Sequence, residues 1–399
     1  MMDLRSIVPD RVSTSAKLFL SGMILNGIGN GVFNVILQLY LMSFGFDSAA
    51  IGSIIMMSAI PATLFTIPAG ILADRYGKRK IILFGFSIAL LAVILILTAR
   101  SIEGFRLAFL LLGVNNATGV VWTPLYSSFF SRENIDRAFG LLGFISIISL
   151  SVGSLMGLVP PMLVANYGFS RQSAYWTTLV VAVGFFLPTM PLLIMSLRGT
   201  VRPDRRGSFK FDLKPKGVVT KFCFISLVRN IGFGVFFSLF PFYTNRKFGV
   251  ESDALGTLYF ASNFVQAGAN IIAARIAKKL GTIRTITATI GLSIPFWLTL
   301  PLAPSFTWLS IIYIMRVGIG NISTPLNDSL YMKLLYDEEK ATANSITSTA
   351  AQGSNIVAPW LGGQLMEQVS LDFPAYLGAG LFVLLAVSYY SLPRDSDDR

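Results

Sequence analysis

The sequence predicts an all-α polytopic membrane protein with twelve transmembrane helices in two pseudo-symmetric six-helix bundles. Composition is the first reason, because 53% of the 399 residues are hydrophobic and only 13% are charged, against about 25% charged residues in soluble domains. The second reason is that apolar runs recur along the whole chain, each near the ~20 residues that a helix needs to cross a bilayer. The third is a repeat of the first half of the sequence in the second half.

Twelve apolar runs form the predicted transmembrane helices. In chain order they cover residues 17–42, 49–73, 80–99, 105–129, 138–165, 173–197, 218–243, 252–276, 284–303, 306–332, 341–367 and 373–392. A polar stretch rich in arginine, lysine and proline separates the sixth run from the seventh, which is typical of a loop. The sequence therefore predicts an N-terminal bundle over residues 1–197, a cytoplasmic linker over 198–217 and a C-terminal bundle over 218–399.

Positive charges lie mainly in the loops on one side of the predicted membrane. The sequence holds 32 lysines and arginines and has a net charge of +12. With the N-terminus inside, the outside loops contain only Arg100, Arg106, Arg171, Arg246 and Lys247. Because cytoplasmic loops are enriched in basic residues, we expect both termini in the cytoplasm and a multi-pass protein of the cell membrane. The charge then sets orientation and does not indicate nucleic-acid binding.

The two halves of the chain repeat one another at an offset of 204 positions, the separation of Asn26 from Asn230. At this offset Phe44, Gly45, Ser48, Gly52 and Gly77 match Phe248, Gly249, Ser252, Gly256 and Gly281. One ungapped register over the first two helices of each half indicates duplication. Because six is an even number of helices, the halves share one orientation and are expected to be related by an axis along the membrane normal.

The loop between the second and third predicted helices has a distinctive pattern. It reads Gly70, Ile71, Leu72, Ala73, Asp74, Arg75, Tyr76, Gly77, Lys78, Arg79, Lys80. Gly70 allows close helix contact, Asp74 can accept hydrogen bonds from backbone amides or an arginine, and Gly77 permits a chain reversal. An ordinary positive-inside turn explains only the basic residues. The acidic residue and both glycines therefore indicate a more specific structure.

This loop resembles the signature loop of the major facilitator superfamily, and the twelve runs, the basic linker and the duplication agree with that resemblance. The resemblance implies a transporter that works by alternating access. It also implies a gating role, and not solute binding, for Gly70, Asp74, Arg75, Gly77, Lys78 and Arg79. The loop of the second half departs from the pattern, with Ala274 and Lys278 at the positions of Gly70 and Asp74.

Amide side chains form a stripe along the first predicted helix. Asn26, Asn30, Asn34 and Gln38 recur every four residues, so they share one helix face. Amides are costly in lipid, and this face meets either a water-filled path between the halves, which we favour, or other helices. Further candidates for the solute-binding surface are Asn115, Trp122, Tyr126, Asn230, Tyr259, Asn263, Gln266 and Gln352.

Two arginines, Arg229 and Arg316, lie near the middle of predicted helices. A charge at that depth is costly without a partner. Each arginine either binds an anionic group of the solute or acts as a structural lock against carbonyl and amide groups. Carboxylates are missing from the middle of every run, so a proton-coupling site is not evident, and Asp328 near the end of the tenth run is the remaining candidate.

Residues for catalysis and metal binding are scarce. The sequence has no histidine and one cysteine, Cys223, which removes the commonest general base and any internal disulfide. We therefore expect no enzymatic activity, no metal and no cofactor. Gly27, Gly29 and Gly31 lack the Gly-Lys-Ser/Thr ending of a phosphate loop and indicate close helix packing.

The whole pattern predicts a secondary or facilitative transporter of a small organic solute, acting as a monomer in the lipid bilayer. Arg229 and Arg316 favour an anionic solute if both face one cavity, and the need for a coupling ion is open. Multidrug efflux of amphipathic compounds is the alternative that 32 phenylalanines and 13 methionines favour, because such side chains form an adaptable lining. A non-transporting membrane sensor is the alternative from another class.

Overall fold

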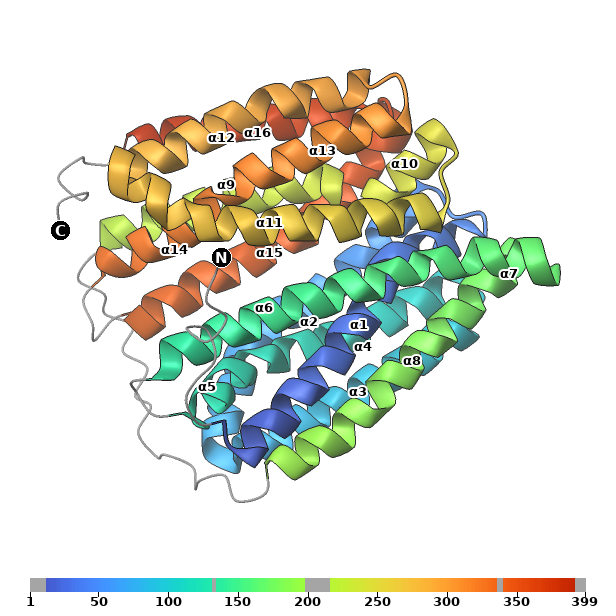
Figure 1. Cartoon of the computed structure of the whole chain (residues 1–399), viewed down its shortest axis with the longest axis horizontal. Helices are drawn as coiled ribbons and strands as arrows, with labels where there is room; N and C mark the ends of the chain where they lie inside the picture. The colour runs from blue at the N-terminus through green and yellow to red at the C-terminus, as the bar shows by residue number, and fades with distance from the viewer. Residues whose placement is uncertain (1–11, 131–133, 198–215, 336–339, 392–399) are drawn as a thin grey trace. The chain divides into compact units, whose positions relative to one another are not determined.

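The structure of the chain is a computed structural model that describes residues 12–130, 134–197, 216–335 and 340–391. Within these ranges the chain consists of α-helices, short 3-10 turns and connecting loops, without β-strands (Figure 1). The predicted all-α class is therefore confirmed. The predicted linker over residues 198–217 lies almost entirely outside the described residues.

The first half of the chain follows the six predicted runs. Its elements are α1 (Thr14–Met42), α2 (Ser48–Tyr76), α3 (Lys78–Thr98), α4 (Ile102–Thr118), the 3-10 turn η2 (Gly119–Val121), α5 (Trp122–Ser127), α6 (Ile135–Leu155), the 3-10 turn η4 (Met156–Leu158), α7 (Val159–Tyr167) and α8 (Arg171–Ser196). The fourth predicted run is α4 continued by α5, and the fifth is α6 continued by α7.

The second half follows the same plan. Its elements are α9 (Lys216–Phe237), α10 (Phe240–Phe248), α11 (Ser252–Leu280), α12 (Thr282–Thr299), the 3-10 turn η5 (Leu300–Leu302), α13 (Phe306–Asn321), α14 (Ser323–Lys333), α15 (Lys340–Gln368) and α16 (Phe373–Tyr390). Here the seventh predicted run is α9 continued by α10, and the tenth is α13 continued by α14.

Prolines explain where single predicted runs are interrupted. The 3-10 turn η4 ends two residues before Pro160, which is followed by Pro161, and α10 begins one residue before Pro241. Proline lacks the backbone N–H and its ring clashes with the carbonyl group of the preceding turn, so the regular helix stops and restarts there. These interruptions were not part of the sequence prediction.

The predicted repeat is confirmed by the positions of helix ends and turns. The bounds of α2 and α11 differ by the same 204 positions at both ends, from Ser48 to Ser252 and from Tyr76 to Leu280. Gly45 and Gly249, which match at this offset, have φ angles of 85° and 65°, and Gly77 and Gly281 have φ angles of 97° and 86°. The two halves thus repeat in backbone conformation as well as in sequence.

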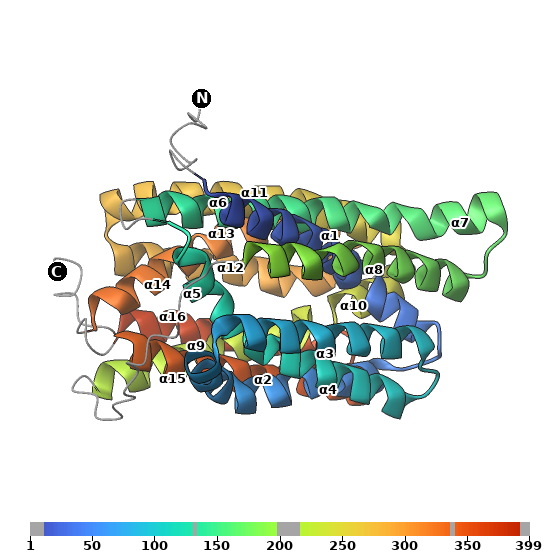
Figure 2. The ribbon, with the colours of Figure 1, turned by 90° about the horizontal axis from the view of Figure 1, so that it is seen from below.

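Contacts divide the chain into two compact units. Unit 1 comprises residues 1–45, 60–207 and 251–260, and unit 2 comprises residues 46–59, 208–250 and 261–399. In unit 1, α1 packs against α6 and α8, and α3 lies along α4 (Figures 1 and 2). In unit 2, α9 packs against α15 and α16, and α12 packs against α16 and α13 (Figure 1).

Close packing between α1 and α6 depends on glycine. A Cβ atom at Gly31 would lie 2.3 Å from the Leu150 carbonyl oxygen, and one at Gly153 would lie 2.1 Å from the Ile28 carbonyl oxygen. Only residues without a side chain permit this approach. The interpretation of the glycines in the first helix as packing residues is confirmed.

Candidate solute path and gating contacts

The loop from α2 to α3 turns at Gly77. Its φ angle of 97° lies in a region open almost only to glycine, and its N–H donates to the Ala73 carbonyl oxygen at 2.9 Å. The predicted chain reversal is confirmed. Arg75 is exposed and stacks over the Tyr76 ring with 5.5 Å to the centroid, while the side chain of Asp74 lies outside the described residues.

The other predicted glycine of this loop has a different environment. A Cβ atom at Gly70 would lie 3.9 Å from Val120, which is an ordinary van der Waals contact. The expectation that Gly70 permits a close helix contact is therefore wrong in this structure, because the space already accommodates a methyl group. Lys78 is the first residue of α3 and is half-buried. Arg79 follows it and is exposed.

The amide stripe on α1 is partly exposed at membrane depth. The Nδ2 atom of Asn30 donates to Oδ1 of Asn26 at 2.7 Å and to its carbonyl oxygen at 2.8 Å. Asn30 and Asn34 are exposed, whereas Asn26 and Gln38 are half-buried. Asn34 has no hydrogen bond to any residue that the structure describes. Within unit 1 this helix face therefore presents the amide group of Asn34 without a hydrogen bond to the described residues.

The candidates on the fourth predicted run differ in burial. Asn115 and Trp122 are half-buried, and the Trp122 ring lies 5.8 Å from that of Phe19. Tyr126 is fully buried and donates its hydroxyl to the Ala138 carbonyl oxygen at 2.9 Å. Tyr126 belongs to the core of unit 1, which corrects its assignment to the solute path.

Two helices are as long as α1 but markedly more polar. In the described residues, ten helical stretches are long and apolar enough to cross a membrane. The helices α11 and α15 are not among them, although each has 29 residues. Helices of this length with polar faces require protein or water beside those faces. Both therefore suit positions beside an aqueous path.

The candidates of the second half are mostly half-buried side chains. On α11, Gln266 donates to Oδ1 of Asn321 at 3.3 Å, and Tyr259 and Asn263 are half-buried. On α15, Gln352 accepts from Asn355 at 3.3 Å. Asn230 on α9 donates to the Ser226 carbonyl oxygen of its own helix at 2.7 Å.

Arg316 on α13 is held in a cage of aromatic rings. Its side chain is only 4% exposed. Its guanidinium carbon lies 4.4 to 5.6 Å from the ring centroids of Phe233, Phe237, Trp297 and Phe382. Aromatic faces attract cations, most strongly where water is excluded. Arg316 forms no ion pair and no hydrogen bond within the described residues, so these rings are its main compensation.

Arg229 on α9 lies in a more open environment. It is half-buried near the middle of the membrane-length stretch Gly217–Phe248. No hydrogen bond or ion pair joins it to any residue in the described part of the chain. Its charge acts on Tyr389 of α16, as does the charge of Asp328 on α14. Of the two deep arginines, Arg229 is the one whose donors are available.

Two equivalent serine contacts, which the sequence pattern does not reveal, lie at the first turns of α2 and α11. Within unit 2, Ser48 donates its hydroxyl to the Gly363 carbonyl oxygen at 3.0 Å. Within unit 1, Ser252 donates its hydroxyl to the Gly157 carbonyl oxygen at 2.7 Å. The match of Ser48 with Ser252 in the repeat was visible in the sequence, but their partners are distant in the chain.

Glycines allow the backbones at these two contacts to touch. A Cβ atom at Gly157 would lie 2.2 Å from the Ser252 carbonyl oxygen, and one at Gly363 would lie 2.3 Å from the Ser48 carbonyl oxygen. The start of α2 is thus packed inside unit 2 and the start of α11 inside unit 1, while the remainder of each helix belongs to the other unit.

Comparison with known proteins identifies relatives along the whole chain. The family model of the Major Facilitator Superfamily matches residues 19–331 and, in a second match, residues 222–399. A tetracycline resistance protein of class H from Pasteurella multocida is 21% identical over 380 residues, covering 92% of this chain and 93% of its own. An uncharacterized transporter from Buchnera aphidicola is 28% identical over 188 residues, and the match covers 46% of each chain.

Solved structures share the fold. The crystal structure of an auto-inhibited peptide transporter of the POT family superimposes with a TM-score of 0.76 at 11% identity, over 95% of this chain and 96% of that one. Identity this low bears on the fold alone. The family model matches most of the sequence, and the shared fold agrees with that match. The chain therefore belongs to the major facilitator superfamily.

Proposed function

We propose that the chain transports a small organic solute carrying an anionic group across the membrane by alternating access. The observation that carries the proposal is Arg229, a half-buried cation at membrane depth without a partner in the described residues. An unpaired charge there is costly, and a bound anion would offset that cost. Guanidinium groups bind carboxylates and phosphates with two parallel hydrogen bonds.

Neutral amide groups would hold the rest of the solute. Asn30 and Asn34 on α1 and Asn263 and Gln266 on α11 offer both donors and acceptors. Such groups suit hydroxyl, carbonyl and amide functions of a metabolite. Asn26, which accepts a hydrogen bond from Asn30, supports its neighbour. The proposed set is completed by Gln38, Asn115, Trp122, Asn230, Tyr259 and Gln352.

Arg316 has a structural role and does not bind the solute directly. Its four aromatic neighbours leave its guanidinium group little exposure. The positive charge nevertheless adds to the potential in unit 2 and favours an anion there. The serine contacts of α2 and α11, together with the loop around Gly77, would provide the gates that open in turn.

Ligand-dependent thermal unfolding of the purified protein tests the proposal. A ligand that binds the folded state raises the unfolding temperature by mass action. We expect stabilisation by members of a panel of organic anions, loss of that effect in Arg229→Gln, and its retention in Lys221→Gln, an exposed cation on the same helix. Equal stabilisation of the parent and Arg229→Gln by every active anion would contradict the role of Arg229.

Efflux of amphipathic drugs is the second candidate function. The similarity to the tetracycline resistance protein, which extends over most of both chains, supports it. The same panel distinguishes the two functions when it includes lipophilic cations and neutral drugs. Stabilisation by those compounds, without stabilisation by any anion, would favour efflux over the anionic solute.

We further propose that the protein lies in the cell membrane as a monomer with both termini in the cytoplasm. The distribution of basic residues supports this orientation, since Lys78, Arg79 and Lys80 lie at one end of α3 and only Arg100 follows its other end. Cytoplasmic loops carry the excess of positive charge. Labelling of single engineered cysteines at the two ends of α3 from either side of the membrane tests it.

A further inference from the structure

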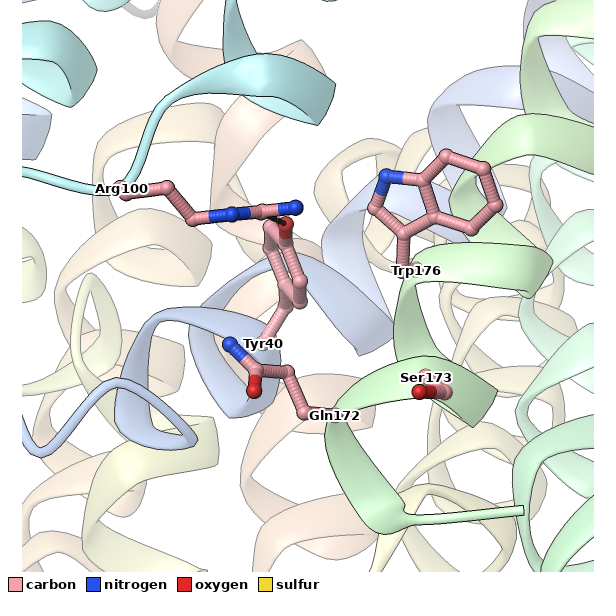
Figure 3. Close-up of a pocket in the computed structure, with 5 residues that line it drawn as sticks. All are labelled: Tyr40, Arg100, Gln172, Ser173 and Trp176. Atoms are coloured by element: carbon pink, nitrogen blue, oxygen red, sulfur yellow. Dashed lines mark hydrogen bonds between the residues drawn. The ribbon is translucent and has the colours of Figure 1, made fainter.

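A cavity of about 410 Å³ opens in unit 1 at the end of α3 opposite the basic loop. It is lined by Tyr40 of α1, Arg100 of the loop between α3 and α4, and Gln172, Ser173 and Trp176 of the first turns of α8. Figure 3 shows the Arg100 guanidinium group reaching the Tyr40 hydroxyl, with the three α8 side chains around them. These residues are separate from the proposed solute path.

The polar side chains that line this cavity keep hydrogen-bond donors that no described residue uses. Arg100 is exposed and donates only to the Tyr40 hydroxyl at 3.3 Å and to the Ala99 carbonyl oxygen at 3.4 Å. It forms no ion pair within the described residues, and Gln172 has no hydrogen bond there either. The Ser173 hydroxyl accepts from Ser170 at 2.9 Å, which leaves its own proton to donate.

The walls of the cavity are fixed by the protein itself. Trp176 donates its indole N–H to the Leu97 carbonyl oxygen at 2.9 Å, and Tyr40 is fully buried. Ser170 caps α8 by accepting from the Ser173 N–H at 3.2 Å. The N-terminus of a helix carries partial positive charge, so the first turn of α8 adds to the positive potential of Arg100.

The equivalent corner of unit 2 contains the carboxylate that this cavity lacks. There, Lys247 donates to the Tyr243 hydroxyl at 3.0 Å and pairs with Asp372 at 2.6 Å. The Tyr243 hydroxyl also donates to Asp372 at 2.7 Å. Asp372 directly precedes α16, as Ser170 directly precedes α8. The same combination of tyrosine, cation and helix start is thus neutralised internally in one half and left open in the other.

We propose that the cavity around Arg100 binds a phosphate-bearing anion in the place that Asp372 occupies in the other half. Arg100, Gln172 and Ser173 donate hydrogen bonds to the phosphate oxygens, and Trp176 covers the attached group. The volume exceeds that of a phosphate alone, so an attached glycerol or similar group fits with it. The same chemistry is offered by the head group of an anionic phospholipid and by a soluble phosphate ester.

Equilibrium binding to the purified full-length protein in neutral detergent tests the proposal. Two probes distinguish the sources of phosphate, namely short-chain phosphatidylglycerol and soluble glycerol 3-phosphate, with short-chain phosphatidylcholine as the zwitterionic comparison. Gln172→Glu places a carboxylate among the donors and mimics the other half, and Arg100→Gln removes the cation. Arg106→Gln is the matched control, because it removes an equal charge that is already paired with Glu103 outside the cavity lining.

We expect Gln172→Glu and Arg100→Gln each to weaken binding of at least one anionic probe by about tenfold or more, since each loses charge-assisted hydrogen bonds. Arg106→Gln should change it by less than about twofold. Binding of phosphatidylglycerol alone identifies a lipid site, and binding of both anionic probes identifies a site for soluble phosphate esters. No binding of either anionic probe, equal losses in Arg100→Gln and Arg106→Gln, or equal affinity for phosphatidylcholine would overturn the proposal.

Discussion

Gly157→Ala tests whether the contact between η4 and the first turn of α11 controls opening at that place. The added Cβ atom would lie 2.2 Å from the Ser252 carbonyl oxygen, whereas ordinary contacts begin at 3.4 Å. The two backbones must therefore separate by about 1 Å. That shift lengthens the 2.7 Å hydrogen bond from Ser252 to Gly157 to roughly 4 Å, beyond hydrogen-bonding distance.

The energetic cost of this change is substantial. Overpacking costs about 1–3 kcal/mol, and the lost hydrogen bond adds about 1 kcal/mol. Because each 1.4 kcal/mol corresponds to about a tenfold change in an equilibrium constant, the population with the contact open should rise at least about tenfold. The contact lies within unit 1, so its opening can be measured without the solute.

Cysteine accessibility measures the opening. Leu255, fully buried in the first turns of α11, is replaced by cysteine after Cys223→Ser removes the only native thiol. The rate of labelling by a membrane-impermeant maleimide should rise about tenfold in Gly157→Ala. Gly143→Ala in α6, where a Cβ atom would meet nothing within 4 Å, should leave the rate unchanged. An unchanged rate in Gly157→Ala, or the same increase in both variants, would refute the reasoning.

Three further predictions concern stability, measured by unfolding in detergent. A double-mutant cycle of Phe237→Leu with Arg316→Met should give a coupling of about 1–2 kcal/mol, because the ring lies against the guanidinium group; additive effects would exclude a cation–π contribution. Gly77→Ala should destabilise the protein by about 1–3 kcal/mol, because alanine is strained at positive φ, and an unaffected unfolding curve would contradict the observed turn. Tyr126 donates its hydroxyl to the Ala138 carbonyl oxygen, twelve residues further along the chain, and Tyr331 in the second half donates to the Ala343 carbonyl oxygen at the same separation. Tyr126→Phe and Tyr331→Phe should each cost about 1 kcal/mol, because each removes one buried hydrogen bond; a loss in only one half would argue against the equivalence of the two contacts.

The sequence was sufficient to predict the helices and the repeat because both leave local signals. Apolar runs give the spans, and Gly77 marks a turn that only glycine tolerates readily. The offset between Asn26 and Asn230 predicted the matching ends of α2 and α11. These features depend on residue type and spacing along the chain, and no knowledge of packing is needed to detect them.

The remaining features depend on contacts between distant segments. Trp122 and Tyr126 are four residues apart and share a helix face, but packing against Phe19 and Ala138 buries Tyr126 in the core. Spacing alone does not reveal this burial. The aromatic cage of Arg316 likewise draws its rings from three other helices. The cavity around Arg100 is formed by three chain segments, and none of them carries a sequence pattern that indicates a binding site.

Solute flux into proteoliposomes tests the central claim, that the chain moves a solute along the amide-bearing face of α1, most directly. A radiolabelled anion that stabilises the purified protein should enter the vesicles with saturable kinetics. Replacement of the exposed Asn34 by leucine should abolish most of this flux, whereas Leu91→Ala, an exposed apolar position on α3, should preserve it. Binding of the anion without any uptake, or unchanged uptake in Asn34→Leu, would contradict the claim.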